Sequence, residues 1–181
     1  MDNQTNVLLP FVNHFIRVAS LIAKAGGVFS AVLMAAMTLH VILEICLRAF
    51  FNSSTFVLDE FVGYGVAAMT FMTLGYALET NSLIRVNILL VRIRSEFGRR
   101  LVEVLCALVA LMVSSYIAIY FWTSVSRNFT RGVTSGTMAE IPLWIPESFV
   151  LIGLGVFIIQ LLAYILKVIS GQSLLVVVEQ E

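Results

Sequence analysis

Charged residues are scarce in this chain. Only 12% of its 181 residues are Asp, Glu, Lys or Arg, whereas 60% are hydrophobic, and the mean hydropathy is +0.98. Soluble domains carry about a quarter charged residues, so this shortage indicates a protein embedded in lipid. The basic and acidic residues cancel, leaving a net charge of zero. A nucleic-acid-binding protein needs a basic surface, and this sequence predicts none.

The residues of metal, haem and catalytic sites are also few. The chain has two cysteines and two histidines, and it has no nucleotide-binding loop, nucleophile elbow or zinc-protease motif. Cys46 and Cys106 are expected near opposite membrane surfaces, too far apart for a disulfide, and both are interpreted as buried apolar thiols. His40 is the only histidine in a predicted span, which disfavours paired haem ligation. We therefore expect no enzyme activity, no cofactor and no metal ion.

Four long apolar stretches, by contrast, are each close to the length of about 20 residues that a helix needs to cross a bilayer. None alternates with the period of a membrane barrel strand. The first stretch is extended to about residue 50, because Glu44 and Arg48 form a favourable i,i+4 pair. The sequence predicts an all-α membrane protein with a single membrane domain over 1–181. Its four transmembrane helices are expected at about 25–50, 59–79, 103–126 and 146–167.

The distribution of basic residues predicts the orientation. Eight of the eleven lie in the amino-terminal segment, the 79–103 connection and the carboxyl tail, which share one side of a four-span chain. Basic residues favour the cytoplasmic side, so both termini are expected there, including a short cytoplasmic tail at 171–181. An uncleaved first span is expected to act as the signal-anchor.

Two further segments have helical amphipathic patterns. Over 10–24 and 85–100, apolar residues recur on one face and basic residues on the other, which predicts interfacial helices lying against the inner leaflet. A plain solvated helix is the alternative for both. The expected contacts with lipid headgroups are Arg17, Lys24, Arg85, Arg92, Arg99 and Arg100.

Small residues recur at spacings of four within the spans. Such ridges let helix backbones approach closely in lipid, where no hydrophobic force drives helix association. The candidate helix-packing residues are Gly27, Ala31, Ala35, Gly63, Ala67 and Gly75.

Two segments carry a resemblance to a known family. The first runs from Arg48 through FFNSSTFVLDEF to TFMTLGYALETNSLIRVNILL, and the second is SGTMAEIPLWIPESFVLIG. Asn52 follows the first span, Glu60 opens the second, Gly75 lies near its end, and Trp144 stands at the entry to the fourth. In these features the chain resembles the small membrane subunit (Q-type) of tripartite ATP-independent periplasmic (TRAP) transporters. The likeness extends to length, number of spans and charge bias.

The resemblance implies a complex in the bacterial inner membrane. A large multi-span permease subunit carries the substrate and coupling ions, and a periplasmic substrate-binding protein delivers an organic acid. Uptake is driven by an ion gradient, with sodium expected. The small subunit is expected to brace the large subunit as a scaffold and not to transport alone.

Asp59 and Glu60 stand at the start of the second span. Acids there stabilise the positive end of a helix dipole, and Ser53, Ser54 and Thr55 are candidate caps. Alternatively, Glu60 pairs with Arg48 or with a basic residue of the large subunit. Ion binding is the weakest interpretation, since two carboxylates give too few ligands. The candidates for partner contact or helix capping are Arg48, Asn52, Asp59, Glu60 and Trp144.

Two other functions are weaker alternatives to the scaffold. A self-contained four-helix exporter acting as a homodimer needs an acidic residue within a span, and the predicted spans have none deep inside. A quinone-linked oxidoreductase needs cysteine pairs or haem histidines, which are not evident.

Overall fold

Four helices make up the described part of the chain. The computed structural model describes residues 5–80, 82 and 96–169. Each of the four helices is long and apolar enough to cross a membrane, which confirms the all-helical fold with four candidate spans. The helices are α1 (Thr5–Phe51), α2 (Leu58–Glu79), α4 (Glu96–Arg131) and α5 (Trp144–Ile169).

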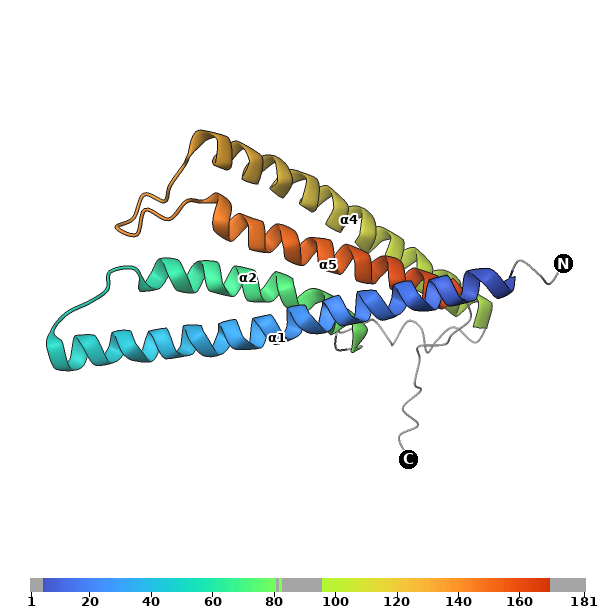
Figure 1. Cartoon of the computed structure of the whole chain (residues 1–181), viewed down its shortest axis with the longest axis horizontal. Coiled ribbons are helices and arrows are strands. Elements are labelled where there is room, and N and C mark those ends of the chain that lie inside the picture. The colour runs from blue at the N-terminus through green and yellow to red at the C-terminus, as the bar shows by residue number, and fades with distance from the viewer. Residues whose placement is uncertain (1–4, 81, 83–95, 170–181) are drawn as a thin grey trace, which may run out of the picture.

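The bundle is elongated and has two distinct ends (Figure 1). The connections 52–57 and 132–143 lie together at one end, called the loop end below. The beginning of α1 and the last turns of α2 and α5 lie at the other, called the terminal end. Consecutive helices that run in opposite directions produce this arrangement.

Helix α1 is unbroken over 47 residues. At about 1.5 Å per residue it measures about 70 Å, more than twice the thickness of a bilayer core. The structure thus has no separate helix over 10–24, which corrects the predicted boundary near residue 24. Ala19 and Ala23 in this segment are buried, and Ala23 lies beside Gly75 of α2. This packing holds the segment in line with the span.

Other predicted segments lie outside the described residues. They are the tail 171–181 and most of the interfacial helix 85–100, including Arg85 and Arg92. The side chain of Arg99 is also outside them, whereas Arg100 is exposed on α4.

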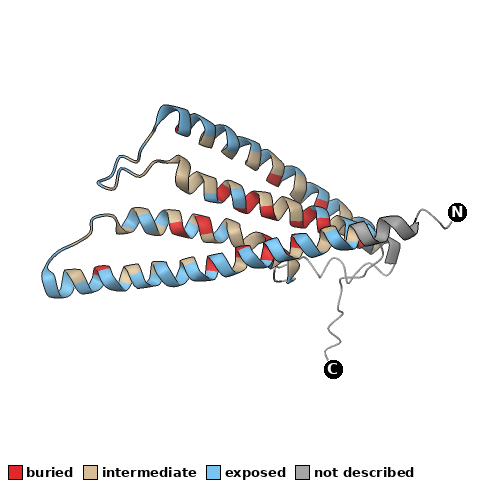
Figure 2. Ribbon diagram, in the orientation of Figure 1, coloured by how far each residue is buried: buried red, intermediate tan, exposed pale blue. Residues whose placement is uncertain are grey.

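Few residues of the bundle are buried, and much of its surface is exposed (Figure 2). The buried apolar residues are mostly Ala, Val and Leu, and many are on α5, which contacts each of the other three helices. Large apolar side chains such as Phe50, Met112 and Trp122 are exposed on the outside. An interior of Ala, Val and Leu beneath many exposed large apolar side chains suits a bundle whose surroundings are lipid.

Two glycines bring neighbouring helices onto the backbone of α2. A Cβ atom on Gly153 of α5 would lie 2.5 Å from the carbonyl carbon of Phe71 and 2.7 Å from the nitrogen of Met72. A Cβ atom on Gly26 of α1 would lie 2.7 Å from the Met72 oxygen. Nearby, the Ser30 hydroxyl on α1 donates to the Met69 carbonyl of α2 at 3.0 Å. Helices α1, α2 and α5 therefore meet at a backbone contact that only glycine allows.

This contact corrects the predicted small-residue ridge on α1. The buried small residues of α1 are Ala19, Ala23, Gly26 and Ser30, spaced by four, three and four. The prediction chose Gly27 and Ala31, each one residue after the buried Gly26 and Ser30. It assumed a constant spacing of four, whereas the residues that face a neighbouring helix alternate between spacings of three and four.

The predicted packing residues therefore separate into two groups. Gly27 lies against the ring of Tyr76, and Gly75 lies against Val156. Of the others, Gly63 has open space within 4 Å of where a Cβ atom would lie, Ala31 and Ala35 are exposed, and Ala67 is half-buried.

The two cysteines are both free, as predicted, and both are exposed. Their predicted burial within the chain was wrong. A small apolar thiol suits the outer surface of a membrane helix as well as its interior, so sequence alone does not distinguish the two.

The glycine contact predicts a sharp difference between two neighbouring positions on α5. Gly153→Ala should lower the stability of the purified chain by about 1–3 kcal/mol, because a methyl group would collide with the α2 backbone. The matched control is Gly155→Ala, where nothing lies within 4 Å. There the change should be neutral or stabilising by about 0.5–1 kcal/mol, as for any helical glycine with open space beside it.

Thermal unfolding of both variants in detergent, followed by size-exclusion chromatography, measures the difference. Equal melting temperatures for the two variants would contradict the contact.

Candidate functional site

Three glutamates organise the loop end of the bundle. Glu44 comes from α1, Glu60 from α2 and Glu147 from α5, and each accepts hydrogen bonds from a connection or a neighbouring helix. Carboxylates can accept several hydrogen bonds at once, which suits them to hold irregular chain in place.

Glu44 holds the connection between α1 and α2. Its side chain is 1% exposed, while that of Arg48, its ion-pair partner at 2.9 Å, is 60% exposed. The carboxylate also accepts from the Ser54 hydroxyl and from Thr55, whose backbone N–H lies at 3.1 Å and whose hydroxyl lies at 2.6 Å. The predicted i,i+4 pair is present, but the main partners of Glu44 are groups about ten residues later in the chain.

Asn52 occupies the turn that ends α1. This exposed residue follows the last helical residue and has a φ of 47°. Asn tolerates the left-handed region better than most residues. The next N–H, of Ser53, donates to the Leu47 carbonyl at 3.3 Å. Asn52 therefore turns the chain toward Glu44, which is a structural reason for an asparagine at this position.

Glu60 and Asp59 have different surroundings, although both lie in the first turn of α2. Glu60 accepts hydrogen bonds from Tyr64 at 2.9 Å and from the Thr137 hydroxyl. Asp59 is exposed, and no side-chain partner of it is found among the described residues. Both acids can still interact with the helix dipole. Only Glu60 joins α2 to the 132–143 connection.

Two of the possibilities that the sequence left open for this turn are not found among the described residues. Glu60 does not pair with Arg48, because Arg48 is directed to Glu44. The residue before α2 is Val57, which makes no side-chain capping bond. Ser54 and Thr55 donate to Glu44 and are not caps of α2.

Glu147 joins α5 to α4. It accepts two hydrogen bonds from the Asn128 amide, both at 3.0 Å, and one from Ser124 at 3.1 Å. Asn128 is buried. Trp144, the first residue of α5, packs edge-to-face on Phe129 with ring centroids 5.4 Å apart. The sequence made Trp144 a candidate for partner contact, and the structure shows that it also fixes the start of α5 on the end of α4.

The 132–143 connection is itself ordered by hydrogen bonds. Gly132 ends α4 with a φ of 58°, and the N–H of Val133 donates back to the Asn128 carbonyl at 3.2 Å, which is a Schellman closure. Ser135 and Ile141 then pair through their backbones at 2.8 Å. The connection is a short hairpin that places Thr137 on Glu60.

His40 packs on the ring of Phe61 with centroids 5.9 Å apart. Its Nε2 atom is buried and has no hydrogen-bond partner in the described part of the chain. Among the described residues, no three or more His, Cys, Asp and Glu side chains are grouped to hold a metal ion.

The terminal end carries a second polar cluster. Glu79, the last residue of α2, accepts from the Ser20 hydroxyl and faces Lys24 across 3.8 Å. Arg17 lines a cavity beside them. Two of the residues predicted to contact lipid headgroups, Arg17 and Lys24, thus lie together at this end.

Sequence reasoning missed several of these partners. It gave Glu44 only the neighbour four residues away, and it assigned no role to Glu147 or Asn128. It also overlooked Gly26. The signal for Gly26 was available in the alternating spacing of Ala19, Ala23, Gly26 and Ser30. The partners of Glu44 and Glu60 include residues 10 and 77 positions away, and no local pattern encodes such distances.

Residues 37–171 match the family described as Tripartite ATP-independent periplasmic transporters, DctQ component. The matched region begins within α1 and includes α2, α4 and α5. No curated protein and no solved structure matches the chain.

The Glu44 contacts predict that one carboxylate controls the order of the 52–57 connection. With Cys46 and Cys106 replaced by Ala, a cysteine in place of the exposed Ser53 reports on this connection. Adding Glu44→Gln should raise its maleimide labelling rate about two- to tenfold, because an amide accepts fewer and weaker hydrogen bonds. The control is Glu140→Gln, at an exposed loop position. Unchanged labelling after Glu44→Gln would contradict this role.

Proposed function

We propose that this chain, which belongs to the DctQ component family of tripartite ATP-independent periplasmic transporters, is the stationary scaffold subunit of its transport system. Family membership makes it a multi-pass membrane component of a transporter and not an enzyme. It also implies two partners, a larger permease and a periplasmic binding protein.

The observation that carries the scaffold proposal is where the chain uses its carboxylates. Glu44, Glu60 and Glu147 all hold the chain's own connections and helices at the loop end. A carrier's coupling site needs ionisable groups directed at a pathway within the membrane. Here those groups fix the bundle, and the glycine contact on α2 fixes its middle. These features favour a rigid subunit against which a partner moves.

In this proposal the permease partner carries the substrate and the ions. The exposed apolar surface of the bundle is available both to lipid and to the permease. The binding protein delivers an organic acid from the periplasm, and a sodium gradient drives uptake. The organic acid and the sodium ion are both assigned from the resemblance of the chain to its family.

The orientation is proposed from the basic residues. Eight of the eleven basic residues belong to the segments on the same side of the membrane as the two termini, and we place this side in the cytoplasm. The terminal end of the bundle then faces the inner leaflet, and the loop end faces the periplasm. This places the three glutamates on the side from which a binding protein approaches.

A division of roles between the two acids of α2 follows. Glu60 is engaged with Thr137 within the chain, whereas Asp59 is exposed. We assign Asp59 to contact with a basic residue of a partner and Glu60 to the internal support of the 132–143 connection. Arg48 is 60% exposed and remains accessible to a partner beside its Glu44 contact.

Reconstitution tests the scaffold proposal. Vesicles that contain this chain together with its permease, supplied with binding protein and an external sodium gradient, should accumulate a radiolabelled organic acid. Vesicles with this chain alone should not exceed the leak of empty vesicles, because the substrate site lies on the partner. Uptake by this chain alone would overturn the proposal, and replacement of external sodium by potassium checks the coupling ion.

Charge reversal at the two neighbouring acids tests their division of roles. Asp59→Lys should reduce co-purification with the permease at least about fivefold, since it places like charges together, while the melting temperature of the isolated chain falls only slightly, through the lost interaction with the α2 dipole. Glu60→Lys should lower that melting temperature, because it breaks the bond to Thr137. Identical behaviour of the two variants in both measurements would contradict the assignment.

A further inference from the structure

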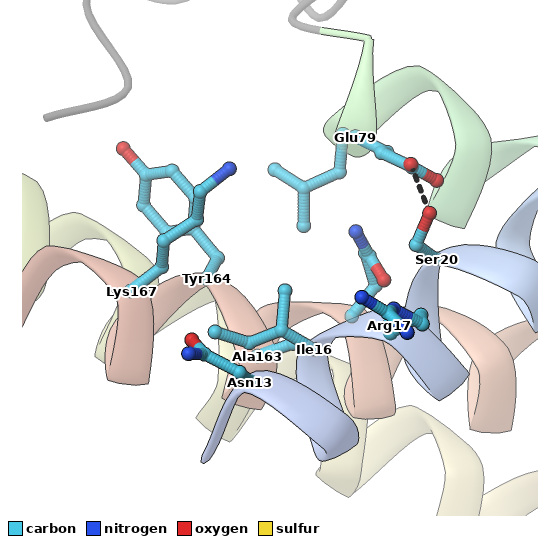
Figure 3. Close-up of a pocket in the computed structure, with 10 residues that line it drawn as sticks. Asn13, Ile16, Arg17, Ser20, Glu79, Ala163, Tyr164 and Lys167 are labelled. Carbon is cyan, nitrogen blue, oxygen red and sulfur yellow. Dashed lines mark hydrogen bonds between the residues drawn. The ribbon is translucent and has the colours of Figure 1, made fainter. Parts of the chain in front are cut away.

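A polar cavity lies between three helices at the terminal end (Figure 3). Its volume is about 380 Å³. It is separate from the three glutamates of the loop end, and its α1 wall precedes residue 37, where the family match begins. The polar residues that line it include Arg17, Ser20, Glu79, Gln160, Tyr164 and Lys167.

The cavity lies at the level of a membrane surface. About 20 helical residues cross the bilayer core, and the α1 residue about 20 positions before Glu44 is Lys24. Helix α2, which is 22 residues long, ends at Glu79, and Lys24 faces Glu79 across 3.8 Å. With the loop end at one membrane surface, as proposed above, both counts put this cavity where headgroups replace hydrocarbon at the other surface.

Two hydrogen-bond acceptors in the cavity wall are unpartnered. Gln160 is only 8% exposed, and its Oε1 atom is buried with no hydrogen-bond partner in the described part of the chain. Glu79 uses one oxygen for Ser20, while its Oε2 atom is buried and equally without a partner there. Buried acceptors of this kind are rare, because leaving them unsatisfied is costly. They indicate that a donor group belongs in the cavity.

Two cations line the same cavity. Arg17 and Lys167 form no ion pair with the described residues, and Figure 3 shows them on different sides of the space, Arg17 on α1 and Lys167 on α5. Basic pockets between membrane helices at the headgroup level favour phosphate groups. An anion by itself would leave the acceptors unsatisfied, and a cation by itself would be repelled by Arg17 and Lys167.

We infer that this cavity binds a phosphoethanolamine group. Its phosphate lies with Arg17 and Lys167, and its ammonium donates hydrogen bonds to Gln160 Oε1 and Glu79 Oε2. The group has two possible sources, the headgroup of phosphatidylethanolamine in the adjoining leaflet or a soluble compound such as glycerophosphoethanolamine. The inference rests on the proposed contact of the terminal end with the membrane surface, and it does not depend on which solute is transported.

Native mass spectrometry of the delipidated full-length chain tests it. Equimolar phosphatidylethanolamine, phosphatidylcholine and phosphatidylglycerol with identical acyl chains are added together. One phosphatidylethanolamine should bind about tenfold more tightly than either competitor, because a trimethylammonium group has no N–H to donate and glycerol has no positive charge for Glu79. Gln160→Leu should reduce the preference over phosphatidylcholine, because Glu79 Oε2 is then the one assigned acceptor left for the ammonium, and Arg17→Gln should weaken binding of every phospholipid.

A matched control and a second probe complete the experiment. Arg127→Gln, an exposed arginine near the loop end, should leave lipid binding unchanged. Displacement of the bound lipid by glycerophosphoethanolamine identifies a soluble source, and retention of the lipid identifies a membrane source. Equal binding of the three lipids, or full retention of phosphatidylethanolamine by a folded Arg17→Gln variant, would overturn the inference. Uptake in the reconstituted system is measured separately, so a failure here leaves the scaffold proposal standing.

Discussion

The architecture depends on the contact that the backbone of α2 makes at Phe71 and Met72 with glycines of two other helices. In lipid, apolar side chains gain nothing by leaving their surroundings, so helices associate through close van der Waals contact and hydrogen bonds. Gly153 and Gly26 supply the close contact, and Ser30 adds a hydrogen bond between α1 and α2. Among the described residues, the buried apolar side chains are those of Ala, Val and Leu, while many larger apolar side chains lie outside. Helix α4, which packs mainly on α5, is the most peripheral of the four.

Polar side chains with structural roles gather at the two ends of this apolar middle. At the loop end, Glu44 and Glu60 bind the two connections, and Glu147 binds the end of α4. At the terminal end, Glu79 draws Ser20 and Lys24 together. Each end thereby joins segments that are far apart in sequence. These contacts between distant segments support the proposed role of the chain as a stationary scaffold.

The two ends nevertheless differ in a way that matters for function. The glutamates of the loop end are satisfied by hydroxyl, amide and backbone donors of the chain itself. At the terminal end, acceptors on Glu79 and Gln160 remain unpartnered among the described residues, beside Arg17 and Lys167. The first end is complete as a structure, whereas the second has the chemistry of a binding site. The proposed lipid site at one end and the proposed partner contacts at the other are compatible with its membership in a tripartite transport family.

The sequence by itself determined the class of the protein. Long apolar runs and few charges predicted four membrane helices, and the motifs around Glu60 and Trp144 led to the family, because both kinds of signal are local in the chain. The i,i+4 pair of Glu44 and Arg48 was also predictable, since helix geometry fixes it. Only the tertiary structure decided that Glu44 holds Thr55, that Glu60 binds Thr137 in place of Arg48, and that Gly26 rather than Ala31 lies in the helix seam. The physical reason is that a helix pattern states which residues share a face, but the rotation of each helix against its neighbours sets which face is buried and which distant donor reaches a carboxylate.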